Sequence, residues 1–195
     1  MTIMHEEGIV LGFDLDGVII DHTQNKMLIA SRYGIELSPK DTHAEHMGTH
    51  FTPELYRVIK SQLYDSTALA LEAPLMAGAF ATLAKLREQG IPYFLVSLQK
   101  NPMHAAHLLE ERGLWGTYFT PENTLFARNA DEKHALAAQI GVTHFIDDEP
   151  NILDVMISIP NRILFDARGL FPEKTDYCHV ESWSELAETL GMANR

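Results

Sequence analysis

From residue 75 onward, short apolar segments typical of buried strands alternate with segments of helical periodicity. This alternation predicts a parallel sheet covered by helices, because two parallel strands must be joined by a long crossover connection. The expected strands are residues 91–96, 124–127, 142–146 and 162–165, together with the apolar run 9–13 near the start of the chain. The expected helices are residues 75–89, 101–112, 131–141, 152–157 and 182–190. We therefore predict an α/β fold with a parallel sheet of about five strands.

Residues 21–73 interrupt this pattern. They contain amphipathic stretches at residues 25–33 and 53–71 but no convincing strand, so we expect a small helical insertion directly after the first strand. Ligands of an open parallel sheet bind beyond the carboxyl ends of its strands, and an insertion at this point would lie over that region. We therefore predict an α/β core made of residues 1–20 and 74–195, with residues 21–73 as a helical cap.

Two acids, Asp14 and Asp16, follow the first expected strand, and Gly17 comes next. Residues two apart in an extended chain point the same way, so the two carboxylates should leave the strand on one side and repel each other. A hard divalent cation, which takes oxygen ligands, would relieve this repulsion and leave one carboxylate free to attack an electrophile such as phosphorus. The alternative is an ordinary Asp-Gly turn at the end of a strand.

Polar side chains also follow the later strands. Ser97 ends the second strand just before a helix, where its hydroxyl and the amide groups of Leu98 and Gln99 could hold a phosphate. Alternatively, this serine only caps a turn. Asp147 and Asp148 follow the fourth strand, and two neighbouring acids at the end of a buried strand are again unfavourable without a cation.

A single lysine, Lys133, lies in the first turn of the helix that leads to the fourth strand. The helix dipole opposes a cation there by on the order of 0.3–1 kcal/mol, so we expect a functional anion nearby. The alternative is that Lys133 simply pairs with Asp131 or Glu132.

In order and spacing, four segments resemble the motifs of the haloacid dehalogenase-like (HAD) hydrolase superfamily. Residues 13–18 (Phe-Asp-Leu-Asp-Gly-Val) resemble its first motif, Val96-Ser97 the second, Lys133 the third, and residues 145–148 (Phe-Ile-Asp-Asp) the double-aspartate form of the fourth. The resemblance covers nearly the whole chain. It implies a Rossmann-like, three-layer core with a helical cap, and phosphatase chemistry.

The same resemblance implies roles for individual residues. Asp14 would be the nucleophile that forms an aspartyl-phosphate intermediate, and Asp16 would protonate the leaving oxygen and later activate water. Mg2+ would be held by the Asp14 carboxylate, the Asp16 backbone carbonyl and Asp148, with Asp147 in an outer position. The substrate phosphate would be bound by Ser97, the Leu98 backbone and Lys133, since phosphoryl transfer depends on positioning and charge compensation.

The sequence departs from the family pattern in two places. Leu98 and Gln99 stand where a small or polar residue is more usual, so only the backbone contribution of this motif is expected. Lys133 lacks the common Lys-Pro context, which leaves Arg128 as an alternative phosphate-binding cation. The dehalogenating branch needs no general acid at the position of Asp16, so this residue favours a phosphate ester as the substrate.

These observations favour a Mg2+-dependent phosphatase acting on a small phosphorylated metabolite. A phosphomutase of the same chemistry is an alternative, because a cap that excludes water favours return of the phosphoryl group to the substrate. A non-catalytic binding or regulatory protein of the same fold is another. The retention of Asp14, Asp16, Lys133 and the double acid argues against that last alternative.

Charge and composition limit the partners. The formal net charge of -12 opposes a large phosphate-tracking surface, so no nucleic acid is expected. No apolar stretch approaches the roughly 18 residues that span a bilayer, so no membrane partner is expected. The N-terminus lacks the features of a signal peptide and the single Cys178 cannot form an internal disulfide, which predicts a cytoplasmic location. The sequence leaves the oligomeric state open.

Several polar residues fall in the expected cap. His22 and Lys26 enter it just after the acidic motif and are expected to contact the substrate. His43, His46 and His50 are spaced to share a helix face, which raises the alternative of a structural zinc site. A glycine at position 48 weakens such a helix and no cysteine joins the set, so we expect a solvated or substrate-facing segment instead.

Overall fold

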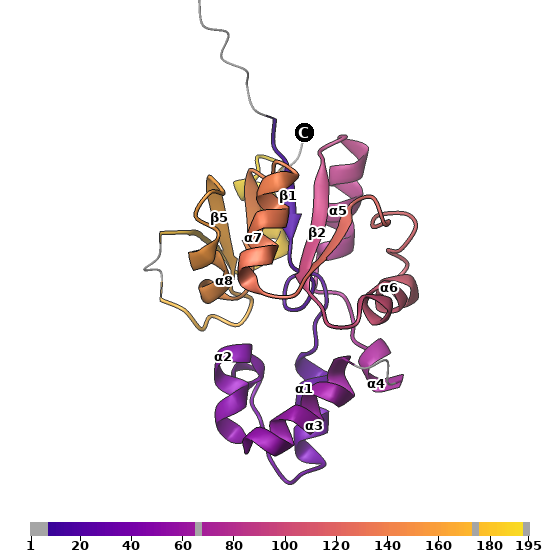
Figure 1. Ribbon diagram of the computed structural model, residues 1–195, viewed down its shortest axis with the longest axis vertical. Helices are drawn as coiled ribbons and strands as arrows, with labels where there is room; N and C mark the ends of the chain where they lie inside the picture. Colours follow the sequence, from indigo (N-terminus) through magenta and orange to yellow (C-terminus); the bar gives the residue numbers. More distant parts are fainter. Residues whose placement is uncertain (1–7, 65–67, 173–175, 193–195) are drawn as a thin grey trace, which may run out of the picture.

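The computed structural model describes residues 8–64, 68–172 and 176–192. Within these ranges, six parallel strands form one sheet in the order β3-β2-β1-β4-β5-β6 (Figure 1). The strands are β1 (Leu11–Phe13), β2 (Tyr93–Leu98), β3 (Thr124–Ala127), β4 (His144–Asp147), β5 (Asn161–Phe165) and β6 (Cys178–Val180). The predicted α/β fold is therefore confirmed, with one strand more than expected.

The additional strand, β6, forms the edge of the sheet beside β5. It is three residues long and begins with the exposed Cys178, followed by the half-buried His179. Only Val180 is buried, so the segment lacks the apolar run by which the other strands were predicted.

Helices cover both faces of the sheet and create two separate cores. The core helices are α5 (Ala79–Glu88), α6 (Pro102–Glu111), α7 (Ala130–Gln139), α8 (Pro150–Val155) and α9 (Trp183–Thr189). One core contains residues of α7 and α8, and the other contains residues of α5, α6 and α9 (Figure 1). Leu95 and Val96, neighbours in β2, belong to different cores because successive strand residues point to opposite faces. No helix in the described ranges is both long and apolar enough to cross a membrane.

Residues 21–73, which we call the helical insertion, lie between β1 and α5 in the sequence, and their described part lies beyond one end of the sheet in space (Figure 1). The insertion contains α1 (Thr23–Ser31), α2 (Ala44–Met47), α3 (Pro53–Tyr64), α4 (Ala68–Leu71) and the 3-10 turns Lys40–Thr42 and Gly48–His50. Its own small core consists of Ile29, Ala30, Leu37, Met47, Ile59 and Leu63.

The chain enters and leaves the helical insertion through one antiparallel stem. The Asp21 amide donates to the Pro74 carbonyl at 2.8 Å, and the Met76 amide donates to the Ile19 carbonyl at 2.8 Å. This pairing explains why α5 begins at Ala79 rather than at residue 75, as the sequence suggested.

Two other predicted boundaries were wrong by a few residues. Asn129, not Asp131, caps α7, because its side chain accepts a hydrogen bond from the Glu132 amide. β2 continues through Ser97 to Leu98, so Ser97 lies within the strand rather than after it. Asn101 caps α6 and Ser182 caps α9, at or near the predicted starts of these helices.

Candidate active site

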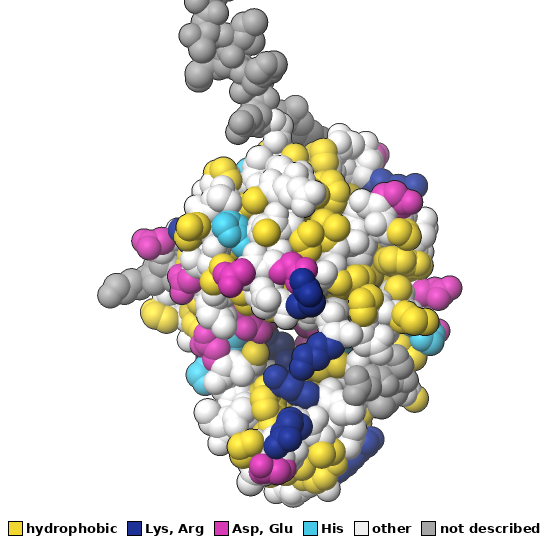
Figure 2. Space-filling model, viewed as in Figure 1, with side chains coloured by type: hydrophobic (Ala, Val, Ile, Leu, Met, Phe, Trp, Pro, Cys, Tyr) yellow, Lys and Arg dark blue, Asp and Glu magenta, His cyan; other side chains and the backbone are white. Residues whose placement is uncertain are grey.

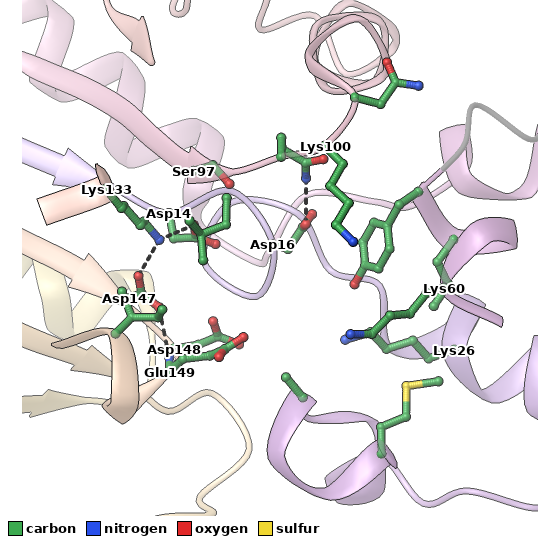
Figure 3. Close-up of a pocket in the computed structure, with 18 of the residues that line it drawn as sticks. Asp14, Asp16, Lys26, Lys60, Ser97, Lys100, Lys133, Asp147, Asp148 and Glu149 are labelled. Atoms are coloured by element: carbon green, nitrogen blue, oxygen red, sulfur yellow. Dashed lines mark hydrogen bonds and ion pairs between the residues drawn. The ribbon is translucent and has the colours of Figure 1, made fainter. Parts of the chain in front are cut away.

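The carboxyl ends of β1, β2 and β4 meet at one cavity of about 420 Å³ beneath the helical insertion (Figure 3). Most of the residues predicted for the site line it: Asp14, Asp16, Lys26, Ser97, Leu98, Lys133, Asp147 and Asp148. Two predicted residues, His22 and Arg128, do not line it. The convergence follows from the topology, because β1 lies between β2 and β4 in the sheet.

Lys133 is the buried cation of this site, with 1% of its surface exposed. Its Nζ donates to Asp14 Oδ1 at 2.5 Å and to Asp147 Oδ2 at 2.6 Å (Figure 3). Burial alone would lower the pKa of Lys133, but the two carboxylates outweigh this effect and raise it. Lys133 is therefore a permanent positive charge that joins the ends of β1 and β4.

Arg128, the alternative cation, points away from the site. Its side chain is 86% exposed and pairs with Glu132, with Nε 2.9 Å from Oε2. This contact also removes Glu132 as a partner for Lys133, one of the alternatives that the sequence had left open.

The buried Asp14 is fixed from several sides. Its amide donates to the Ile146 carbonyl at 3.0 Å, and its carboxylate contacts Lys133 and Ser97. Burial is the largest influence and raises the pKa of Asp14, with Lys133 acting in the opposite direction. Burial likewise raises the pKa of Asp147 to about 7, although Lys133 lowers it. Lys133 thus favours the ionised forms of Asp14 and Asp147.

Asp16 has a different environment from Asp14. His22 Nε2 lies 2.9 Å from Asp16 Oδ1, and Gln99 Nε2 donates to Asp16 Oδ2 at 2.9 Å. Burial would raise the pKa of Asp16, but the His22 ring, with smaller contributions from Lys26 and His104, lowers it overall. Only the backbone of Gln99 was expected to contribute to the site. Its side chain, however, binds Asp16, a candidate catalytic residue.

Asp148 lies directly against the turn formed by Gly17. A Cβ on Gly17 would lie 2.0 Å from Asp148 Oδ2, and the φ of Gly17 is +86°, so this position requires glycine. Burial, followed by repulsion from Asp147, Asp14 and Glu149, raises the pKa of Asp148 well above its ordinary value. Asp148 is thus held beside the first motif, with Arg168 Nη1 4.0 Å and His43 Nε2 3.8 Å from its Oδ2.

Comparison with known proteins identifies the fold. No protein-family model and no curated protein matches the sequence. Among solved structures, a HAD family hydrolase from Deinococcus radiodurans R1 with bound phosphate and sodium matches with a TM-score of 0.65, 18% identity and 96% of each chain covered. The chain has the fold of the HAD hydrolases.

Other HAD structures agree. A HAD hydrolase from Bacillus subtilis bound to magnesium matches with a TM-score of 0.63 and 15% identity, over 95% of this chain and 100% of that one. A predicted phosphoglycolate phosphatase from Haemophilus somnus 129pt matches with a TM-score of 0.60 and 15% identity, over 94% and 98% of the two chains. The Rossmann-like core expected from the motifs is therefore confirmed.

Oxygen atoms dominate the part of this HAD-fold cavity where a metal would bind. The carboxylates of Asp14 and Asp148 both line the cavity together with Asp16, and Asp148 lies against the Gly17 turn. In the described ranges, no group of three or more His, Cys, Asp or Glu side chains is arranged to hold a metal ion. This hard donor set and its excess negative charge fit a cation such as Mg2+.

The insertion contacts the acidic loop through His43. The Glu45 amide donates to His43 Nδ1 at 3.3 Å, so Nε2 carries the proton that is donated to the Asp148 carbonyl at 3.1 Å. Burial lowers the pKa of His43 to about 4, in keeping with this neutral form. The ring centre of the exposed His46 lies 6.2 Å from that of His43, whereas His50 Nε2 lies 3.4 Å from Asp41 Oδ1.

Several residues of the site were not predicted: Tyr56, Lys60, Tyr64, Lys100 and Glu149. Lys100 and Glu149 closely follow predicted motifs, so extending each motif by three residues would have found them. The residues of α3 had no such signal, because a lysine or tyrosine on an amphipathic helix is typical of any solvated face.

Proposed function

We propose that this protein is a HAD-type phosphatase that hydrolyses a small phosphate monoester through an aspartyl phosphate on Asp14. The observation that carries the proposal is the buried contact of Lys133 with both Asp14 and Asp147, at 2.5 and 2.6 Å. A lysine that only stabilised the fold would not need to lie at the carboxyl ends of two strands, at the edge of a cavity. The phosphate bound to the Deinococcus structure of the same fold supports this choice.

In the first step, a carboxylate oxygen of Asp14 attacks phosphorus while the bond to the leaving oxygen breaks. Lys133 and Ser97 hold the Asp14 carboxylate and would contact the phosphoryl oxygens as negative charge moves onto them. Asp16 supplies the proton to the leaving oxygen. The pKa of Asp16 is lowered in the protein without substrate. We therefore infer that Asp16 takes up this proton when the anionic substrate binds beside it.

In the second step, water attacks the phosphorus of the aspartyl phosphate. Asp16, now ionised, accepts a proton from this water, and the bond between phosphorus and Asp14 breaks to release inorganic phosphate. His22 and Gln99 keep the Asp16 carboxylate in place during both steps. His22 would thus act through Asp16 rather than on the substrate.

Mg2+ would be held by the Asp14 carboxylate, the Asp16 backbone carbonyl and Asp148, and when bound it would neutralise charge on the phosphoryl group. Asp147 would lie outside this set of ligands, held by Lys133 and by the Glu149 amide, which donates to Asp147 Oδ1 at 3.0 Å.

We infer that the helical insertion, residues 21–73, is a cap that covers the leaving part of the substrate. Lys26 lines the cavity on that side.

The direct test is hydrolysis of p-nitrophenyl phosphate by the purified protein. We expect activity with Mg2+, loss of activity with excess chelator and recovery when Mg2+ is added back. Ca2+ should restore little activity, because its larger and looser coordination shell suits in-line transfer less well. Full activity in excess chelator, or activity retained by Asp14→Asn, would refute the proposal.

A further inference from the structure

Basic side chains gather on the insertion side of the cavity, although the chain is acidic overall. Of the 15 Lys and Arg residues in the sequence, five line this cavity: Lys26, Arg57, Lys60, Lys100 and Lys133. Figure 2 shows a row of Lys and Arg side chains that runs from the sheet-containing part of the molecule down onto the insertion. They come from different segments, namely α1, α3, α7 and the loop after β2. The fold therefore brings these side chains together, and they do not form a basic run in the sequence.

Three of these cations have no acidic partner in the described part of the chain. No carboxylate there lies within 4.0 Å of the Nζ of Lys26, Lys60 or Lys100, whereas Lys133 has two such contacts and Arg57 pairs with Glu54 at 3.4 Å. Neutral groups contact two of them. Lys26 Nζ donates to the Thr42 carbonyl at 3.0 Å, and Lys60 Nζ lies 4.6 Å from the centre of the Tyr56 ring.

The direction of these side chains separates them from the phosphoryl site. In Figure 3, Lys26 and Lys60 reach into the cavity from the side opposite Lys133, and Lys100 extends along the same side. Lys133 lies at the reacting end, where Asp14 and Asp147 take two of its three N–H donors. The lysines on the insertion side therefore face whatever lies beyond the phosphoryl group.

We propose that the leaving part of the substrate carries a second anionic group, a carboxylate or a phosphate, which Lys26, Lys60 and Lys100 bind. This inference rests on the proposed function. Lys26 is half-buried, and Lys60 and Lys100 are exposed side chains that line the cavity. A bound anion would give all three a charge-assisted partner, which no carboxylate of the described residues supplies within 4.0 Å. A cavity of about 420 Å³ accommodates a small compound of this kind.

Matched pairs of substrates test the proposal. In the first pair, 3-phosphoglycerate carries a carboxylate where glycerol 3-phosphate carries a neutral hydroxymethyl group. In the second pair, fructose 1,6-bisphosphate carries a second phosphate that fructose 6-phosphate lacks. We expect kcat/KM to be at least about tenfold higher for the anionic member of one pair, and the pair that responds identifies the group. Equal values within both pairs would overturn the inference, while turnover of p-nitrophenyl phosphate would leave the proposed function standing.

Charge-removing variants assign the effect to the lysines. In Lys60→Gln/Lys100→Gln, the preference for the anionic member should fall by about tenfold or more. The matched control is Lys85→Gln, which removes a charge from the exposed face of α5, outside the cavity. An unchanged preference in the double variant would show that these lysines only balance Asp148 and Glu149, and would overturn the inference.

A binding measurement keeps the two proposals distinguishable if no substrate is turned over. Calorimetry with Asp14→Asn and Mg2+ would compare the affinities of both members of each pair. Tighter binding of an anionic member, lost in the lysine variants, would support the anion site even if the proposed function failed. Equal or undetectable binding of the two members in both pairs would reject it.

Discussion

The Nζ of Lys133 lies 2.5 Å from Oδ1 of Asp14 in a buried contact. Removing the cation by Lys133→Met would leave Asp14 and Asp147 facing each other without compensation. We expect turnover to be lost and the free energy of unfolding to fall by about 3–5 kcal/mol, as for other buried pairs that lose one partner. Urea unfolding and phosphatase assays measure both effects.

Arg128→Gln is the matched control for Lys133→Met. Arg128 pairs with Glu132 at the surface, so its loss should leave both turnover and unfolding unchanged. If Arg128→Gln abolished turnover while Lys133→Met did not, the assignment of the phosphate-binding cation would be reversed.

Gly17→Ala should damage the site through Asp148. The new Cβ would lie 2.0 Å from Asp148 Oδ2, so the carboxylate must move, and we expect kcat/KM to fall by about 100-fold. Gly34→Ala is the control, because Gly34 has a φ of +74° but no atom within 4 Å of the added Cβ. Both variants should lose about 1 kcal/mol of stability from backbone strain, and only Gly17→Ala should lose activity. Equal activity in the two variants would argue against a role for Asp148.

His22 should affect every substrate alike, because it acts on Asp16. In His22→Asn, the interaction that lowers the pKa of Asp16 is weakened. Because Asp16 must be protonated in the first step, which kcat/KM reports, the basic limb of the kcat/KM profile should move to higher pH. Measured pH profiles with two substrates of different size test this point. A change in the preference between substrates, with no movement of the limb, would instead support the direct substrate contact that the sequence suggested.

His43 should make the protein less stable in mild acid. Its pKa is about 4 in the folded state and near the ordinary 6.5 when unfolded, so the unfolded state takes up a proton first as the pH falls below 6.5. Between pH 7 and pH 5, the native protein should lose about 2 kcal/mol more stability than His43→Gln, which lacks this titration. Urea midpoints at the two pH values give the comparison, and parallel losses would contradict the buried, neutral state of His43.

The sequence predicted the reacting end of the site because simple topology determines it. Asp14, Ser97 and Asp147 each lie at the carboxyl end of a parallel strand, and such ends must meet once the strands pair. Lys133 was predicted from an unfavourable position in its helix, and only the structure distinguishes it from Arg128. The edge strand β6 was missed because three residues with one buried side chain give no periodic signal.

The substrate end was predicted poorly because it depends on side-chain direction in the helical insertion. His22 and Lys26 are only four residues apart, yet the first is buried against Asp16 and the second reaches the cavity. Lys60 and Lys100 are far apart in the sequence and look like ordinary surface charges until the insertion folds over the sheet. Tertiary packing, not local pattern, decides these positions.

The central claim is that Asp14 and Asp16, alike in charge and two residues apart, have different tasks. Asp14→Asn removes the attacking oxygen, so neither phosphoenzyme nor product should form. Asp16→Asn keeps that nucleophile and lacks the proton donor and base, so an activated aryl or acyl phosphate should still phosphorylate it, with slow release of phosphate.

Trapping the protein during turnover, followed by mass analysis of the phosphorylated peptide, is the most direct measurement. We predict that phosphate will be found on Asp14, that it will accumulate in Asp16→Asn and that it will be absent from Asp14→Asn. Phosphate on Ser97 or on a histidine, or near-normal turnover by Asp14→Asn, would contradict the mechanism.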